Sequence, residues 1–584
     1  MMIAPEEIYV AARASTKRHA VRMAFGRFRR EEDGSLLIFG LFTFVMMLLL
    51  AGVALDLMRF EERRTTLQNT IDRASLAAAD LQQTLDPRDV VRDYFRKAGL
   101  KPPADADITV TEGVNADSRK VEIKVTETMP TWFMSLVGVD TLAAPASSTA
   151  EESIGQIEIS LVLDVSGSMN SNNRLINLKP AAKSFIDQIF DSAATDKVSV
   201  SIIPYSTQVS LSDDLASYFN MTVEHNYSNC IEFEQSKGDY TTTAMSFGTD
   251  PGDRVYQRNG HIDPFYRSSP PNLMNCAPQA DRHVLPFSGD RNALKSYIDN
   301  MVAEGNTSID VGMKWGAALL DPSMQGVVDG MIASGDVPSV FSDRPYPYDN
   351  GEVMKIIVVM TDGANTTEYR LRNNTTSNPY YDEGVSLLTR NPFYKTNSVS
   401  SDDFALEQYS LWDASRKQYY IFAINQWRDK PWGDSTYTQT TCNKWGSCST
   451  TTQNDPGYSG SPISVPMTWP EVWNAMSIYW FADNIIYKAY GSSSLRNQWR
   501  PGQTSNPVAN TYINWEKDGL TLDICNAAKA QGVRIYTIAF EAPTEGQQLL
   551  NQCQNAGYYA VEGLDINDAF SGIVNSINKL RLTH

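Results

Sequence analysis

Histidine and cysteine are scarce in this chain: its 584 residues include five histidines and six cysteines. The histidines form no H-E-x-x-H motif, no two cysteines have C-x-x-C spacing, and no mixed cluster has zinc-ligand spacing. A P-loop and a G-x-S-x-G elbow are also absent. These absences argue against metalloproteases, nucleotide hydrolases and serine hydrolases, so we expect a binding protein rather than an enzyme. A hydrolase that uses paired carboxylates remains as an alternative.

Positive charge is also in short supply. The chain carries 50 Lys and Arg against 68 Asp and Glu, which gives a formal net charge of −18. The first 34 residues differ, because they hold seven Lys or Arg and five Asp or Glu. A nucleic-acid surface needs clustered Lys and Arg, so the acidic body argues against nucleic acid as a partner. It favours a soluble domain that attracts cations.

One apolar run is long enough to cross a membrane. Residues 36–55 (LLIFGLFTFVMMLLLAGVAL) contain no charge, and at ~1.5 Å per residue they extend about 30 Å, the thickness of a bilayer core. A buried helix and a cleaved secretory signal are the alternatives, but the leader and the run are both long for a signal. We expect a retained single-pass anchor over 35–58. Lys and Arg are denser before the run than after it, which predicts that 1–34 is a basic cytoplasmic stub.

The cysteines all follow the apolar run. Their even number predicts disulfide bonds in an oxidising compartment. Proximity along the chain suggests three pairs, although six buried free thiols are the alternative. The suggested pairs are Cys230 with Cys276, Cys442 with Cys448, and Cys525 with Cys553.

Residues 59–152 are predicted to form a helical stalk and a small α+β module. Asp56, at the outer edge of the anchor, is expected to face water, with pairing to a neighbouring membrane helix as the alternative. Residues 58–85 contain no Gly or Pro, so the membrane helix is expected to continue through them. Apolar alternation predicts a hairpin from strands near 108–110 and 121–125, and a last strand follows near 141–150.

From residue 155 onward, apolar strands alternate with helices. This pattern predicts an α/β domain over 153–584 with a doubly wound, mostly parallel sheet. A helix at 522–531 is expected before the fourth strand. Two intervals, 210–289 and 366–515, break the pattern and are predicted to be insertions. The strands are predicted at 157–163, 198–205, 355–360, 533–540 and 558–561.

Oxygen-bearing side chains follow two of these strands. Asp164, Ser166 and Ser168 stand in D-V-S-G-S after the first strand, and Asp362 stands in M-T-D-G after the third. The loop G-N-T-S-I-D adds Thr307. In such a sheet, ligands gather outside the carboxyl ends of the strands, so we expect these side chains to meet there. Carboxylates and hydroxyls without His or Cys suit a hard divalent cation, with Mg²⁺ expected and Mn²⁺ or Ca²⁺ as alternatives.

This set supplies five candidate oxygen ligands and only two negative charges. It therefore leaves the coordination shell and the charge of the ion partly unsatisfied. An Asp or Glu of a protein partner is therefore expected to complete the shell. One alternative is a pair of strand-end turns capped by Ser and Asp, with no metal. Another is a structural metal that only stiffens the fold.

Tryptophan is concentrated in the second insertion, where nine of the 11 residues of this type lie. Exposed aromatic rings stack on ligands, which suggests a lectin-like surface as an alternative binding site. The competing interpretation is that these residues form the core of the insertion. Trp445, in C-N-K-W-G-S-C, is the best single candidate for an exposed ligand-binding side chain.

The three oxygen-rich motifs resemble the metal-ion-dependent adhesion site of von Willebrand factor type A domains. The resemblance covers roughly 155–580, with the two intervals as insertions. It implies that the five residues named above coordinate the ion, some of them through water.

The N-terminal segment carries a second resemblance. A-L-D-L-M-R-F and T-L-Q-N-T-I-D-R-A-S-L-A-A-A-D look like the start of TadE/TadG-like proteins of bacterial tight-adherence pilus machinery, and 520–583 fits the TadG-like type. This implies an inner-membrane component of pilus biogenesis or adhesion whose large domain is periplasmic or surface-exposed, and whose partner is pilus machinery or a surface ligand. Prepilins of this machinery carry Glu five residues after the cleaved Gly, but here Phe39 follows Gly34 at that spacing. Cleavage and polymerisation as a pilin are therefore not expected.

Overall fold

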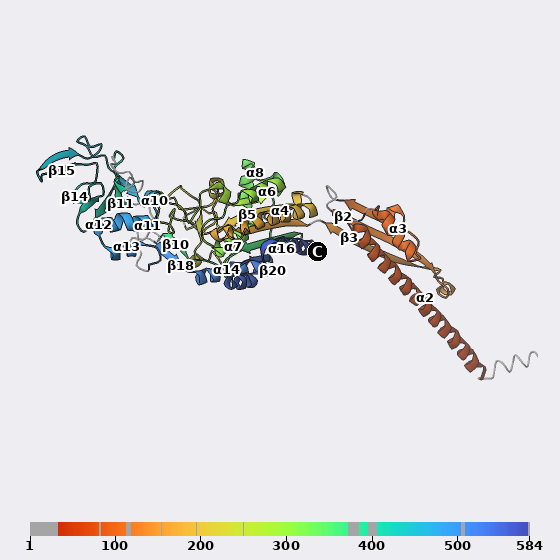
Figure 1. Cartoon of the computed structure of the whole chain (residues 1–584). Helices are drawn as coiled ribbons and strands as arrows, with labels where there is room; N and C mark the ends of the chain where they lie inside the picture. The colour runs from red at the N-terminus through yellow and green to blue at the C-terminus, as the bar shows by residue number, and fades with distance from the viewer. Residues whose placement is uncertain are drawn as a thin grey trace, which may run out of the picture. The chain divides into compact units, whose positions relative to one another are not determined.

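The computed structural model describes residues 33–581 apart from 81–82, 84, 113–117, 154, 194, 249, 251, 372–384, 395–405 and 504–508. The chain divides into two compact units, one ending at Ile154 and the other beginning at Gly155 (Figure 1). Both mix helices with sheets. The stub predicted over 1–34 lies almost entirely outside the described residues.

The first unit begins with one long helix, α2 (Asp33–Ala79). It is long and apolar enough to cross a membrane, and only 6% of its most apolar stretch is buried. A membrane anchor and a signal sequence both meet this criterion. The helix ends at Ala79 rather than near residue 85. A new helix, α3 (Pro87–Lys97), begins soon afterwards because the Asp86 side chain caps it and a proline stands in its first turn.

The C-terminal half of α2 packs on a small antiparallel sheet (Figure 1). Its strands are β1 (Ile108–Glu112), β2 (Ser118–Pro130) and β3 (Thr141–Ser153), in the order β1-β2-β3. Leu67, Ile71, Ala74 and Ala78 recur at helical spacing on one face of α2 and share a core with residues of α3 and the sheet. The turn of the hairpin predicted between 110 and 121 lies outside the described residues.

Asp56 lies at a junction that the sequence did not predict. Its side chain is fully buried and accepts hydrogen bonds from the backbone N–H groups of Trp132, Phe133 and Met134, with N···O distances of 2.7–3.1 Å. The expectation of a carboxylate facing water is therefore wrong. The observed partner is a turn of its own unit, 76 residues away or more, rather than a neighbouring membrane helix.

The second unit is built on a six-stranded sheet in the order β20-β19-β9-β4-β5-β8. The first five strands in this order are parallel, and β8 (Leu285–Ser288) joins β5 antiparallel. The five parallel strands lie within three residues of the predicted bounds. The edge strand β8 was missed, because it is short and lies inside the interval 210–289. The parallel strands are β4 (Gln156–Asp164), β5 (Val198–Tyr205), β9 (Val353–Thr361), β19 (Arg534–Phe540) and β20 (Gly557–Val561).

Helices cover both faces of this sheet. Alternate residues of β4 enter two separate cores, Ile159 and Leu161 in one and Val162 in the other. The first core includes α4 (Arg174–Ser192), α6 (Arg291–Asn300) and α16 (Ile566–Arg581). The second includes α7 (Ile309–Ala318), α8 (Gln325–Ser334), α14 (Asn514–Ala530) and α15 (Thr544–Cys553). Helix α14 begins eight residues before the predicted residue 522.

Helix α7 lies unusually close to the sheet. A Cβ atom added to Gly312 would stand 2.8 Å from the Tyr205 ring, and one added to Gly316 would stand 2.6 Å from Val162. Larger residues would therefore push α7 away. This close packing fixes the loop before α7, which carries Thr307.

The interval 366–515 has a fold of its own. Strands β10 (Glu368–Leu371) and β18 (Ala509–Tyr512) pair antiparallel near its two ends. Between them lies an antiparallel sheet in the order β14-β13-β12-β11-β17, and a separate hairpin, β15 (Thr436–Cys442) with β16 (Cys448–Asn454). The sheet strands are β11 (Val385–Arg390), β12 (Tyr409–Asp413), β13 (Gln418–Ile421), β14 (Gln426–Arg428) and β17 (Val465–Thr468).

Tryptophan forms much of the core of this interval. Trp469, Trp473, Trp480 and Trp499 are buried in one apolar cluster, and the rings of Trp469 and Trp473 stack at a centroid distance of 5.3 Å. Two short helices supply them in part, α10 (Trp469–Ala475) and α13 (Ser493–Trp499). The structure therefore assigns these tryptophans to packing rather than to a ligand surface.

Candidate metal centre

The predicted acidic residues meet at the carboxyl ends of β4 and β9. Asp164 is the last residue of β4, and Asp362 directly follows Thr361 at the end of β9. These strands are parallel neighbours with Leu163 opposite Met360, so both side chains leave the sheet at the same edge. Asp164 and Asp362 are 0% and 3% exposed, which makes this a buried pair of carboxylates.

Hydrogen bonds connect the two carboxylates through the serines. The Ser166 backbone N–H and the Thr361 hydroxyl donate to Asp164 at 2.8 and 2.6 Å. The Ser168 hydroxyl donates to Asp362 Oδ1 at 2.7 Å and lies 3.0 Å from the Ser166 hydroxyl. The D-V-S-G-S turn thus places its hydroxyls between the two carboxylates.

Thr307 comes to the same edge from the loop before α7. The Gly167 N–H of the serine turn donates to Gly305 O at 2.9 Å, which joins the two loops. A Cβ atom added to Gly363 would stand 3.5 Å from Thr307 Oγ1, so this hydroxyl lies beside the residue that follows Asp362. The structure therefore brings all five predicted residues to one edge of the sheet.

The electrostatics of this edge favour a cation. Burial, followed by the nearby negative charge of Asp362, raises the pKa of Asp164 above its ordinary value, although hydrogen bonds from Ser166 and Thr361 act in the opposite direction. The atoms that could bind a metal here are carboxylate and hydroxyl oxygens, without nitrogen or sulfur. This set fits a hard divalent cation such as Mg²⁺, which would relieve the repulsion that raises the pKa. This edge holds two carboxylates and three hydroxyl residues, and no group of three or more His, Cys, Asp or Glu suited to a metal occurs here or in any other described part of the chain.

Arg174 is the residue at this edge that the sequence analysis missed. Its Nη1 atom lies 2.7 Å from Asp362 Oδ2, and its Nε atom lies 2.9 Å from Glu541 Oε2. It is the first residue of α4, where the helix dipole disfavours a positive charge. An arginine six residues after the D-V-S-G-S motif was the available signal. The structure shows that the two carboxylates hold the guanidinium there.

A buried network of charged side chains contacts the Thr307 loop. Lys517 of α14 donates to the carbonyl oxygens of Thr307 and Thr366 at 3.3 and 3.2 Å. Its Nζ atom also lies 3.7 Å from Asp310 and 3.6 Å from Glu368. Although burial raises the pKa of Glu368, the charges of Arg370 and Lys517 outweigh it and hold that pKa below its ordinary value. The network therefore keeps Glu368 ionised and fixes the loop that presents Thr307.

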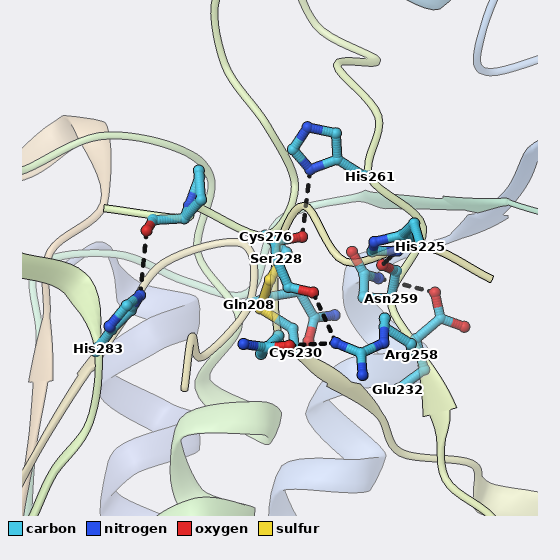
Figure 2. The surroundings of a disulfide bond; sticks show 12 residues. Gln208, His225, Ser228, Cys230, Glu232, Arg258, Asn259, His261, Cys276 and His283 are labelled. Atoms are coloured by element: carbon cyan, nitrogen blue, oxygen red, sulfur yellow. Dashed lines mark hydrogen bonds between the residues drawn. A yellow bond between two sulfur atoms is a disulfide. The ribbon is translucent and has the colours of Figure 1, made fainter. Parts of the chain in front are cut away.

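The structure forms the three disulfide bonds expected from proximity, and Cys230–Cys276 lies in the first insertion (Figure 2). Close to it, Ser228 and His261 approach to 3.3 Å, and His225 lies 2.9 Å from the Asn259 carbonyl. Burial lowers the pKa of both His225 and His261 to about 4. Both rings are therefore neutral near pH 7, and they serve as packing and hydrogen-bonding groups of this insertion.

Trp445 differs from the tryptophans that form the core of its interval. It is 81% exposed at the tip of the β15–β16 hairpin, which Cys442–Cys448 closes. Asn443 Oδ1 accepts from the backbone N–H groups of Trp445 and Ser447, both at 3.0 Å. The tip is therefore rigid, and it presents an aromatic ring to solvent.

Comparison with known proteins identifies the N-terminal segment. Residues 34–81 match the family model "Tad: Putative Flp pilus-assembly TadE/G-like", so this segment is TadE/G-like, as the sequence analysis predicted. Together with the apolar helix α2, this match places the chain at a membrane or in the cell envelope. No curated protein matches the chain.

Several solved structures align with the chain at low similarity. The vWF domain of the type V pili tip protein Mfa5 from Porphyromonas gingivalis shows 12% identity and a TM-score of 0.29, covering 73% of this chain and 96% of that one. The adhesive tip pilin GBS104 from Group B Streptococcus agalactiae shows 12% identity and a TM-score of 0.25, covering 72% and 100%. The pilus adhesin RrgA from Streptococcus pneumoniae shows 13% identity and a TM-score of 0.26, covering 82% of this chain and 48% of that one.

Proposed function

We propose that this chain is a membrane-anchored, non-enzymatic component of bacterial pilus biogenesis or surface adhesion, which binds a protein partner through a divalent cation. The TadE/G-like match over 34–81 supports the link to pilus machinery. The observation that carries the binding role is the buried pair Asp164 and Asp362, which meets three hydroxyl residues at one edge of the sheet. The second unit would then be a doubly wound domain of the von Willebrand factor A type, as its five parallel strands and two helical layers support.

In this proposal the ion is held by the residues of the metal centre. Bound Mg²⁺ supplies a positive centre with strong affinity for carboxylate oxygen. Asp164 and the serine turn are held in place by their own hydrogen bonds, and Lys517 fixes the Thr307 loop. These side chains leave room in the coordination shell for an Asp or Glu of the partner. The residues of the centre are Asp164, Ser166, Ser168, Thr307 and Asp362.

The proposed location follows from α2 and from the charges around it. The apolar helix would cross the inner membrane with residues 1–34 in the cytoplasm and the second unit in the periplasm or at the surface. The three disulfide bonds agree with an oxidising compartment.

Filament counting by electron microscopy tests the proposal. A deletion strain would be complemented with the native chain, with Asp164→Ala, or with Asp299→Ala as a control, at equal protein levels. Asp299 is an acidic residue of the same unit that pairs with Lys183 at the surface. We expect filaments or attachment with the native chain and Asp299→Ala but not with Asp164→Ala. Full function of Asp164→Ala would contradict the metal-dependent role and favour a scaffold with a structural metal or none.

A second binding surface is favoured by one observation, the exposure of Trp445 on a rigid hairpin tip. The strands beside it carry mainly Thr, Ser and Gln side chains that are exposed to solvent. An aromatic ring beside many hydroxyl and amide groups suits a sugar polymer, as the lectin-like alternative requires. Trp445→Ala should then reduce attachment while leaving metal binding unchanged, and unchanged attachment would contradict it.

A further inference from the structure

We propose that the turn at residues 132–137, between β2 and β3, is a membrane-interface contact that α2 holds at the outer end of its span. Both elements belong to the first unit. The inference rests on the proposed role of α2 as a membrane anchor, and it adds a second point at which the chain touches the bilayer.

Gly52 provides the first of three contacts between α2 and the turn. It lies in the last turn of the apolar run 36–55, and the Phe133 side chain packs directly against it. A Cβ atom added to Gly52 would stand 2.4 Å from Phe133 Cγ, closer than real contacts allow. Glycine is therefore required here so that the turn can approach the helix backbone. This contact places Phe133 at the depth where the span ends.

Asp56 provides the second contact, one helical turn further along the same face. Its buried carboxylate accepts from three consecutive backbone N–H groups, those of Trp132, Phe133 and Met134. A carboxylate at a membrane boundary is unfavourable unless its charge is compensated. Here the first N–H groups of the turn compensate it, so the acid and the turn stabilise one another.

Arg59 provides the third contact between α2 and the turn. Its Nη1 atom lies 3.6 Å from Asp56 Oδ1, and its guanidinium carbon lies 3.6 Å from the centre of the Trp132 ring. Gly52, Asp56 and Arg59 follow the i, i+4, i+7 spacing of one helix face. The turn is thus fixed to α2 at three successive levels.

The side chains on the outside of the turn are apolar and exposed. Trp132, Leu136 and Val137 are 61%, 71% and 58% exposed. Next to Asp56, α2 also exposes apolar side chains: Leu55, Leu57 and Met58 are 43%, 45% and 70% exposed. Tryptophan is enriched where a membrane meets water, because its ring is apolar and its N–H is polar. A lipid bilayer is therefore the partner that fits this surface, and its interfacial region would cover the turn.

Site-directed spin labelling of the full chain in phosphatidylcholine vesicles tests this. All six native cysteines are in disulfide bonds, so one introduced cysteine can be labelled selectively. The test site is Leu136→Cys. Met47→Cys reports on the anchor, and Leu76→Cys serves as the matched control. Leu76 is 72% exposed on α2, about 20 residues beyond Asp56 and therefore roughly 30 Å further along the helix.

The measured quantity is the accessibility of each label to oxygen, which partitions into lipid, and to a water-soluble nickel complex. We expect the nickel accessibility at 136 to be about fivefold lower than at 76, with oxygen accessibility retained, because the label lies at the interface. Gly52→Leu or Asp56→Asn should restore nickel accessibility at 136 while the label at 47 stays in the bilayer.

Three results would overturn the inference. Equal nickel accessibility at 136 and 76, with position 47 in lipid, would place the turn in water. Low accessibility to both reagents at 136 would show that protein covers it. Nickel accessibility at 47 would instead contradict the anchor itself, and with it the proposed function on which this inference rests.

Discussion

Arg174 Nη1 lies 2.7 Å from Asp362 Oδ2, so a fixed positive charge already faces a carboxylate of the candidate metal centre. Glu541 holds the other side of the guanidinium at 2.9 Å. Glu541 is itself fixed by the Gly563 N–H and the Asn172 side chain at 3.2 Å each. Arg174 therefore competes with a metal for Asp362 while it remains tied to Glu541.

The first prediction concerns this competition. Arg174→Gln should tighten Mn²⁺ binding to the full chain by about fivefold, because it removes a like charge next to the ion. Isothermal titration calorimetry measures the change. Arg291→Gln is the matched control, since Arg291 also begins a helix and pairs with Asp187 and Asp191 away from the site. Equal or weaker Mn²⁺ binding by a folded Arg174→Gln chain would show that Arg174 only supports the fold.

The second prediction concerns pH. The pKa of Asp164 is raised in the folded chain above its ordinary value of 3.8, so the folded state holds its proton at a pH where the unfolded state has lost it. Without metal, stability should therefore fall as the pH rises above about 4. Thermal unfolding from pH 4 to pH 8 in a chelator measures this.

Asp164→Asn is the control for the pH prediction, because its side chain cannot ionise. Its pH profile should be flatter than that of the native chain. Added Mg²⁺ should restore the stability of the native chain at high pH but not that of the variant. Identical profiles for both chains would mean that Asp164 keeps an ordinary pKa.

The third prediction concerns the charge network beneath Thr307. Lys517→Met should destabilise the second unit by about 3 kcal/mol or more, because it leaves Asp310 buried without its cation and leaves Glu368 paired with Arg370 alone. Denaturant unfolding gives the value. Lys529→Met, on the same helix, changes a lysine that is half-buried, has no buried carboxylate to neutralise and donates to a single carbonyl, so it should cost less than about 1 kcal/mol. Comparable losses in the two variants would argue against a supporting network.

The fourth prediction separates two of the disulfide bonds. Cys525–Cys553 joins two helices on one face of the main sheet across 28 residues, so its replacement by alanines should cost about 3 kcal/mol. Cys442–Cys448 spans 6 residues in an exposed hairpin. Its loss should leave the main unfolding transition unchanged and only loosen the Trp445 tip. Calorimetric unfolding of the two double variants would show the difference, and equal effects would contradict it.

The parts of the fold that could be predicted are those with a strong local signal. The strand that ends at Asp164 and the one that precedes Asp362 are mostly apolar runs, so their bounds and their meeting at one edge followed from the sequence. Cysteine proximity likewise suggested the pairs found. The edge strand β8 gave no such signal, because only four residues form it.

The parts that were missed depend on contacts between distant residues. Asp56 pairs with a turn 76 residues away or more, and Arg174 pairs with Asp362 across 188 residues. Neither contact leaves a periodic pattern in the chain. The sheet inside 366–515 was missed for a related reason, since its short strands lie among Gly, Ser and Asn residues typical of loops.

The most direct test of the central claim is the stoichiometry of Mn²⁺ binding to the full chain, measured by calorimetry for the native protein and for the double variant Asp164→Asn, Asp362→Asn. The account predicts that each native chain binds one Mn²⁺ ion, which Mg²⁺ displaces. It predicts that a folded double variant does not bind Mn²⁺ in this way. Unchanged binding by the double variant, or no binding by the native chain, would contradict the assignment of this edge as a metal centre.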